Sequence, residues 1–150
     1  MPLARSLSHG WGGSPTWFLT TYVLGAQMTG PQSWRVAPQP GSLRSASGQR
    51  PLPAGPLEVA WSRPDCGAFT LTVQTPDSPA LQGEIVLPAG QPLRVLLNGE
   101  MLWSARERQN QRVQLTDEGL VIGDVTAGRY TITSEYACAA TVYLPIVRRK

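Results

Sequence analysis

Apolar and polar residues alternate along the chain from residue 57 onward. In the run LEVAWSR every second residue is apolar, and AFTLTVQT has the same period after the short turn PDCG. The apolar positions of the two runs are Leu57, Val59, Trp61, Phe69, Leu71 and Val73. Because successive side chains of a strand point to opposite faces, this period is typical of half-buried strands. The pattern therefore predicts an antiparallel hairpin whose apolar side chains all share the core face.

Further short runs of the same character follow toward the C-terminal end. LRVLLNGEML carries Asn98 and Gly99 between alternating apolar stretches, which is a strong hairpin signal. The runs RVQL, GLVIGDV and GRYTITSEY come next and are separated by turn-forming residues such as Asp117 and Glu118. Many short strands at close spacing predict a mainly β fold, an antiparallel, jelly-roll-like β-sandwich over residues 57–136.

One N-terminal α-helix is expected before the sandwich, in the run SPTWFLTTYVLG. Ser14 can cap the first amides of a helix, and Pro15 fits its first position, where the missing N–H costs nothing. Gly25 fits the left-handed residue that ends a helix. The residues between them are uncharged, and apolar side chains surround most of the circumference. Such a helix requires partners on several sides, because a helix of about 10 residues is marginally stable alone in water.

The sequence divides into four segments. Residues 1–29 hold the helix, and residues 30–56 are dense in Pro, Gly and Ser, with a few spaced apolar anchors. This composition predicts a connector with short extended pieces that lies against a surface, rather than a disordered linker. The sandwich follows over residues 57–136, and residues 137–150 form a final strand or a basic tail.

The net charge of +3 arises at the C-terminal end of the 150-residue chain, where Arg148, Arg149 and Lys150 follow one another. The other basic residues are scattered singly, so a nucleic-acid partner is not expected. The chain has no apolar run of about 18 residues or more, and its first residues lack the apolar core of a signal peptide. We therefore expect no membrane partner and no signal peptide, which leaves the localisation open.

Few residues offer catalytic or metal-binding chemistry. Cys66 and Cys138 lie far apart, which favours two free thiols, with a disulfide as the alternative. The only histidine, His9, makes no convincing metal site with two isolated cysteines and has no evident nucleophile beside it. Asp117 and Glu118 are adjacent, so they suit a turn better than a pair of carboxylates facing one bond. We expect no catalytic residue, no metal and no cofactor.

Two aromatic residues could take part in carbohydrate binding. A β-sandwich commonly binds sugars by stacking an aromatic ring against the apolar face of a pyranose. Trp103 and Tyr136 are possible platforms of this kind. Core filling is the favoured use of each, because large aromatic side chains are mostly buried.

Most of the chain resembles a known enzyme family. The strings SLSHGWGGSPTWFLTTYVLG, APQPG and GQRPLPAGPLEVAW, in this order and spacing, are similar to the closing segment of α-L-rhamnosidases of glycoside hydrolase family 78. The resemblance covers residues 6–136 and is most specific up to Trp61. It implies that residues 1–29 are the closing helix of an (α/α)6 catalytic barrel absent from this chain, and that a C-terminal β-sandwich domain follows.

The resemblance also has consequences for chemistry. The family is an inverting one, in which one Glu is the general acid and another the general base. Both belong to the barrel upstream of the closing helix, and residues 1–25 contain no acidic residue. His9 matches the family histidine that lines the sugar pocket, which implies a substrate-binding role for His9. Trp11 matches the aromatic residue of the same turn, where it packs on the helix.

We therefore interpret the chain as a C-terminal fragment of an α-L-rhamnosidase-like glycoside hydrolase, a structural or accessory sandwich that is inactive alone. Its implied partners are rhamnose-containing glycans or glycosides, reached through the parent enzyme, and the missing catalytic barrel. A carbohydrate-binding or purely structural β-sandwich module is the first alternative. A truncated reading frame without a functional product is the second.

Overall fold

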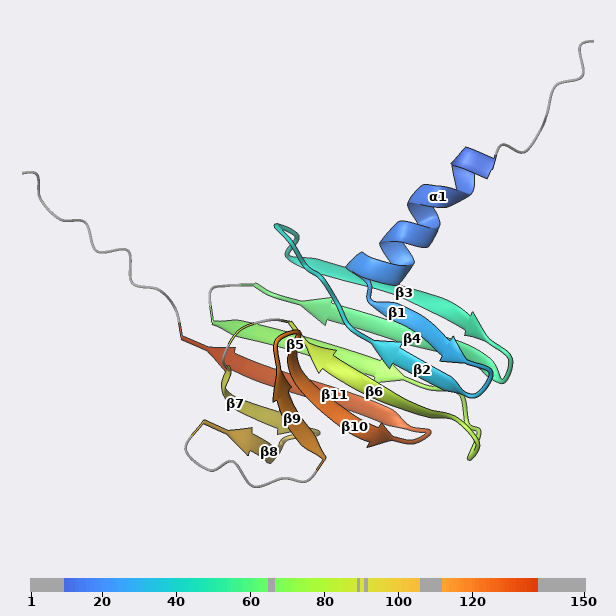
Figure 1. The fold of residues 1–150 in the computed structure, drawn as a ribbon. Helices are drawn as coiled ribbons and strands as arrows, with labels where there is room; N and C mark the ends of the chain where they lie inside the picture. The colour runs from blue at the N-terminus through green and yellow to red at the C-terminus, as the bar shows by residue number, and fades with distance from the viewer. Residues whose placement is uncertain (1–9, 65–66, 89, 91, 106–111, 138–150) are drawn as a thin grey trace, which may run out of the picture.

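Two β-sheets lie face to face, and one helix projects away from them (Figure 1). The computed structural model describes residues 10–64, 67–88, 90, 92–105 and 112–137. The arrangement is sandwich-like and mainly β, with one N-terminal helix, which confirms the predicted fold class. Residues 66 and 138, the two cysteines, lie outside the described residues.

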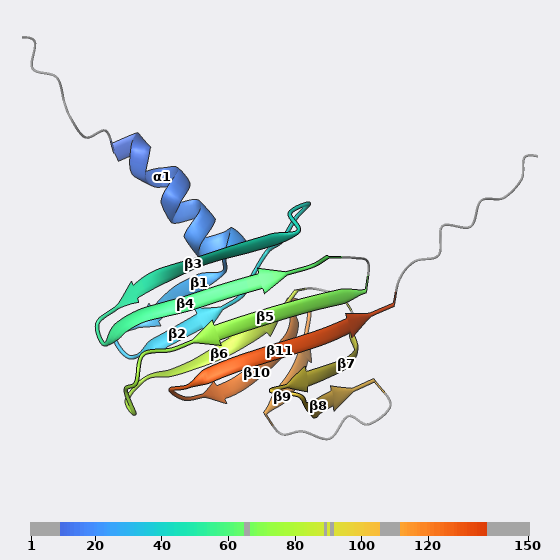
Figure 2. The same cartoon turned by 180° about the vertical axis from the view of Figure 1, so that it is seen from behind.

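Across the described residues, eleven strands form the two sheets. The first sheet has five strands in the spatial order β1 (Ala26–Gly30), β2 (Ser33–Val36), β6 (Gln82–Leu87), β10 (Gly119–Val125) and β9 (Val113–Thr116). The second has six in the order β3 (Ser45–Leu52), β4 (Gly55–Ser62), β5 (Ala68–Gln74), β11 (Arg129–Tyr136), β7 (Pro92–Leu97) and β8 (Glu100–Ser104). Figure 2 shows β3, β4, β5 and β11 of this second sheet side by side.

One strand pair differs from the antiparallel arrangement that the sequence predicts. β2 and β6 run parallel, with Trp34 opposite Gly83 and Val36 opposite Ile85. Between these strands the chain crosses to the second sheet, forms β3, β4 and β5, and returns beside β2 in the same direction. Such a parallel pair needs a long crossover, which the intervening strands supply.

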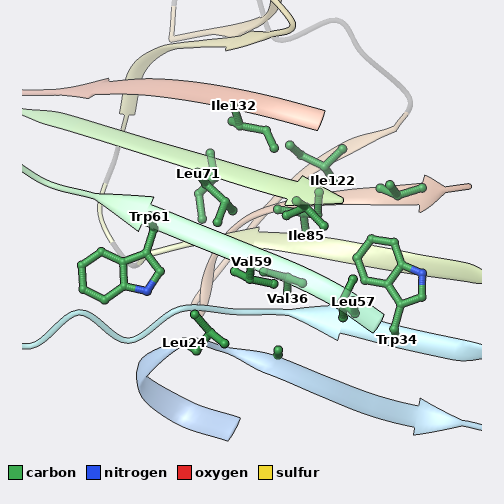
Figure 3. Packing of buried hydrophobic residues seen from close by; sticks show 14 of the residues in the cluster. Leu24, Trp34, Val36, Leu57, Val59, Trp61, Leu71, Ile85, Ile122 and Ile132 are labelled. Atoms are coloured by element: carbon green, nitrogen blue, oxygen red, sulfur yellow. The ribbon is translucent and has the colours of Figure 1, made fainter. Parts of the chain in front are cut away.

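The alternating apolar residues form the core, as predicted. Their side chains are at most 2% exposed: Leu57, Val59, Trp61, Phe69, Leu71 and Val73. β4 pairs with β5 so that Val59 faces Val73 and Trp61 faces Leu71. Residues from the other sheet, including Val36 and Ile85, pack against this face, as Figure 3 shows.

A glycine provides the space for the largest fully buried side chain, Trp34. A Cβ built on Gly83 would lie 2.3 Å from the indole ring of Trp34, far inside van der Waals contact. The ring therefore packs directly over the backbone of the neighbouring strand β6. The sequence pattern offered no sign of this contact, because the two residues are far apart in the chain.

Residues 30–56 are more than a connector. They contain β2 and β3, which belong to different sheets, so this Pro- and Gly-rich segment builds one edge of the sandwich. The sandwich thus begins before the predicted residue 57, because β1 starts at Ala26 and Ala26 is completely buried. Ala26 pairs with Val36, which places β1 beside β2 as the edge strand of the first sheet.

The helix differs from the prediction at its start and agrees with it at its end. The chain is already helical at Gly10, so Ser14 is not a cap and Pro15 lies inside α1 (Gly10–Phe18). A wider π-type turn, η1 (Leu19–Val23), follows, and Gly25 then adopts a left-handed φ of 83° as predicted. Within the described residues, no helix has the length and apolar character needed to cross a membrane.

Candidate functional site

The helix exposes large apolar side chains along its last turns. Trp17, Phe18 and Leu19 are each more than half exposed. The ring of Tyr22 contacts Trp17 edge to face at 5.7 Å between centroids and Phe18 at 5.2 Å. Exposed apolar surface of this kind is typical of interaction sites, because large water-facing apolar groups are unfavourable. We name Trp17, Phe18, Leu19 and Tyr22 the aromatic patch.

The base of the helix is fixed to the sandwich by hydrogen bonds to three successive carbonyls. The side-chain amide of Gln27 donates a hydrogen bond to the carbonyl oxygen of Thr21 at 3.1 Å. The backbone N–H of Gln39 donates one to the carbonyl oxygen of Tyr22 at 3.0 Å. The indole Nε1–H of Trp61 donates to the carbonyl oxygen of Val23 at 2.9 Å. The last carbonyls of a helix have no partner within the helix. Here the sandwich supplies the hydrogen-bond donors for these carbonyls, so the helix leaves the sandwich in a fixed direction.

The residues after the helix close this junction. Leu24 is buried in the core and lies next to the end of the helix in Figure 3. A Cβ on Gly25 would lie 2.3 Å from the backbone nitrogen of Pro38, and the Gly25 carbonyl accepts a hydrogen bond from the N–H of Ala37 at 2.9 Å. The backbone at Gly25 thus passes against the chain that follows β2, where no side chain fits. The helix cannot pivot freely at this glycine.

Three glutamates at the surface of the sandwich are paired with arginines. Arg35 on β2 forms an ion pair with Glu84 at 3.2 Å and another with Glu118. Glu118 lies in the turn between β9 and β10, as its sequence neighbourhood predicts. Arg94 donates two hydrogen bonds to Glu135, and these hydrogen bonds hold the pKa of the Glu135 carboxyl below its usual value. Glu135 is therefore ionised near neutral pH and does not suit a general acid.

The two possible sugar platforms have different surroundings. Trp103 is 8% exposed and belongs to the core, as favoured from the sequence. Tyr136 is half-buried and lines a cavity of about 630 Å³ at one end of the sandwich. Its hydroxyl donates a hydrogen bond to the carbonyl oxygen of Pro88 at 3.3 Å, and burial raises the pKa of its phenol.

The residue to which the resemblance assigns substrate contact is His9, and it lies outside the described residues, as does the side chain of Trp11. The described part of the chain contains no group of three or more His, Cys, Asp or Glu residues that could hold a metal ion. Sequence reasoning missed the anchoring roles of Gln27, Gln39 and Trp61. Trp61 lies on β4, 38 residues after Val23, so no local signal indicates its contact with the helix.

One comparison with known proteins found a match. The model of a protein family described as "Bacterial alpha-L-rhamnosidase C-terminal domain" matches residues 24–101. The matched region starts at Leu24, the first residue after η1, and includes the first seven strands and the first residues of β8. A comparison with curated proteins found no match.

Proposed function

Since the chain belongs to the bacterial α-L-rhamnosidase C-terminal domain family, we propose that it is the accessory sandwich of an α-L-rhamnosidase-like glycoside hydrolase. In this role it does not catalyse. Its helix packs against the catalytic barrel of the enzyme as the closing helix, and the sandwich holds that helix in place. Rhamnose-containing glycans or glycosides are then substrates of the assembled enzyme.

The observation that carries this proposal is the combination of an exposed aromatic patch with a fixed helix base. The patch has large apolar side chains and no charge, which suits a partner that buries a helix on several sides. The hydrogen bonds from Gln27, Gln39 and Trp61 set the direction of the helix before any partner binds. A preorganised surface loses less conformational entropy on docking.

The surroundings of three carboxylates support an accessory role. An inverting glycosidase needs one carboxyl group with a raised pKa and a second that activates water. Glu84 and Glu118 share Arg35, and Glu135 has a lowered pKa beside Arg94. These glutamates are thus engaged in ion pairs on the outside of the sheets.

The non-catalytic part of the proposal is tested with the purified chain and an aryl α-L-rhamnoside. We expect no hydrolysis above the buffer background. Turnover that survives repurification and disappears in a His9→Ala variant would show that the chain is itself an enzyme.

The docking part is tested by adding the chain to the catalytic barrel of a bacterial α-L-rhamnosidase from which the C-terminal domain has been removed. The wild-type chain should raise the melting temperature of the barrel, and the double variant Trp17→Ser, Phe18→Ser should not. Leu115→Ser is the matched control, because Leu115 is an exposed apolar residue on β9, away from the helix. Equal effects of the double variant and the wild type would contradict docking through the helix.

Carbohydrate binding by the sandwich itself is a second candidate function. The cavity lined by Tyr136 favours it, because ligand cavities commonly measure about 300 to 1,000 Å³. The cavity volume of about 630 Å³ lies within this range.

A further inference from the structure

The cavity beside Tyr136 lies at one end of the sandwich, where several strands of both sheets end. Its wall includes Phe69 from the start of β5, Pro88 after β6 and Tyr136 at the end of β11. Phe69 is 1% exposed, so it closes the inner end of the cavity toward the core. The remaining wall comes from the loop before β3 and from the residues after β4, which carry Arg44 and Arg63.

Arg44 and Arg63 face each other across the end of the β3–β4 pair. The last paired residues of these strands are Ser45 and Ser62, and the backbone N–H of Arg63 donates to the carbonyl oxygen of Arg44 at 2.7 Å. Both arginines are exposed and line the cavity. Like charges directly opposite each other on two strands destabilise a sheet. The fold therefore holds two positive charges together without gaining stability from them.

The surrounding residues give little compensation for this repulsion. The side chain of Arg63 donates one hydrogen bond to the carbonyl oxygen of Gly41 at 2.8 Å, which orients its guanidinium group. Among the described residues, the ion pairs use Arg35 and Arg94, and no acidic side chain lines the cavity. Two guanidinium groups that have no carboxylate beside them among the described lining residues are suited to bind an anion from outside.

The aromatic side of the cavity is held in place. The hydroxyl of Tyr136 is hydrogen-bonded to Pro88, and a Cβ added to Gly90 would lie 3.2 Å from the tyrosine ring. The Tyr136 ring is thus positioned from two directions. A positioned aromatic ring offers an apolar surface to the face of a sugar at a low entropic cost.

We propose that this cavity binds a carboxylate-bearing sugar, a uronic acid unit of a glycan. The guanidinium groups of Arg44 and Arg63 hold the carboxylate, and the ring of Tyr136 packs against the pyranose. The sugar part of this assignment rests on the proposed function, because it takes a glycan to be the natural surroundings of the domain. The anionic part rests on the two arginines alone.

Three small ligands separate these contributions in a nuclear magnetic resonance titration of the full chain. D-glucuronate carries both the sugar ring and the carboxylate, D-glucose has only the ring, and acetate has only the carboxylate. We expect D-glucuronate to shift the side-chain Nε–H signals of Arg44 and Arg63 and the ring signals of Tyr136. Its affinity should exceed that of glucose and that of acetate by about tenfold or more, the value of one good charged hydrogen bond.

Substitutions identify the groups involved. Arg44→Gln and Arg63→Gln should each weaken glucuronate binding by about tenfold. Arg129→Gln is the matched control, because Arg129 is exposed at the opposite end of β11 from Tyr136 and lines a different groove. This control removes the same charge and should leave the affinity unchanged. A thermal melt of each variant shows whether it is folded.

Several results would overturn the proposal. Acetate binding as tightly as glucuronate would show a general anion site without a sugar subsite, and equal losses in Arg129→Gln and Arg63→Gln would show a bulk charge effect. Absence of any saturable shift would refute the site. Asp65, which lies outside the described residues, provides one more check. If Asp65→Asn lowers the melting temperature as Arg63→Gln does and glucuronate does not bind, the arginines serve a structural ion pair.

The same variants separate this proposal from the proposed function. Arg44→Gln and Arg63→Gln should still raise the melting temperature of the rhamnosidase barrel. The Trp17→Ser, Phe18→Ser variant should still bind glucuronate. If the wild-type chain binds glucuronate but does not dock on the barrel, the accessory role is wrong and the glucuronate site stands. If the chain docks but does not bind glucuronate, only the glucuronate site is wrong.

Discussion

The indole Nε1 of Trp61 donates a hydrogen bond to the carbonyl oxygen of Val23 across 2.9 Å, which joins strand β4 of the second sheet to the last turn of the helix. Trp61 is also a core residue, stacked on Phe69 at 6.0 Å between ring centroids. One side chain thus packs the sandwich and orients the helix. A change at this position should affect both.

Trp61→Phe should lower the free energy of unfolding by more than Trp34→Phe does. Both indoles are at most 2% exposed, so the two changes remove a similar buried volume. Trp34 Nε1 has no hydrogen-bond partner among the described residues, whereas removal of Trp61 Nε1 leaves the Val23 carbonyl without its donor. An unpaired buried polar group costs about 1 to 3 kcal/mol, and this is the expected difference between the variants. Urea denaturation of both measures it, and equal losses would show that the hydrogen bond contributes no stability.

Phe69→Ala should destabilise the sandwich far more than Thr70→Ala. Phe69 is 1% exposed in the core, and truncation of a buried Phe typically costs about 3 to 5 kcal/mol. Thr70 lies on the outer face of the same strand, where substitutions usually change stability by about 0.5 kcal/mol or less. Parallel denaturant melts compare the two. A larger loss at Thr70 would mean that the β4–β5 face assignment is reversed.

Deletion of residues 1–18 should give a more monodisperse protein, and deletion of residues 1–29 should not. The shorter deletion removes the exposed Trp17 and Phe18 but keeps Leu24 and the whole of β1. The longer deletion removes the core residue Leu24 and nearly all of β1, which opens the edge of β2 to other chains. Light scattering and a thermal melt of each protein distinguish the outcomes. If the shorter deletion aggregates more than the full chain, the exposed helix does not cause association.

The stabilising effect of Glu135 should disappear in acid. Hydrogen bonds from Arg94 lower the pKa of Glu135 in the folded protein below its ordinary value of 4.5. A carboxyl group with a depressed folded-state pKa contributes stability above its unfolded pKa and loses it as the pH falls through the folded one. The melting temperatures of wild type and Glu135→Gln should therefore differ slightly at pH 7 and converge as the pH drops below 4.5. The difference is small because both partners are exposed and solvent screens the pair. A difference in melting temperature that stays constant with pH would show that packing, and not the charge of Glu135, causes it.

Local patterns were sufficient for the features that depend on neighbours in sequence. The period of two placed Phe69 in the core, and Gly25 ended the helix with a positive φ. Asn98 and Gly99 form the turn between β7 and β8 with φ values of 51° and 88°. These features follow from steric rules and side-chain alternation within a few residues. The resemblance to the rhamnosidase family over residues 6–136 also came from the sequence, and the family model matches residues 24–101 of this range.

The tertiary structure decided everything that depends on which distant segments meet. The Pro- and Gly-rich segment 30–56 lacks a clear strand period, yet β2 and β3 form there because each finds a partner strand. The parallel pairing of β2 with β6, the contact of Trp34 with Gly83 and the anchoring of the helix by Trp61 all join residues far apart in the chain. Alternation tells which face of a strand is buried, but it carries no information about which strand lies alongside. That choice is made by packing and hydrogen bonding over the whole sandwich.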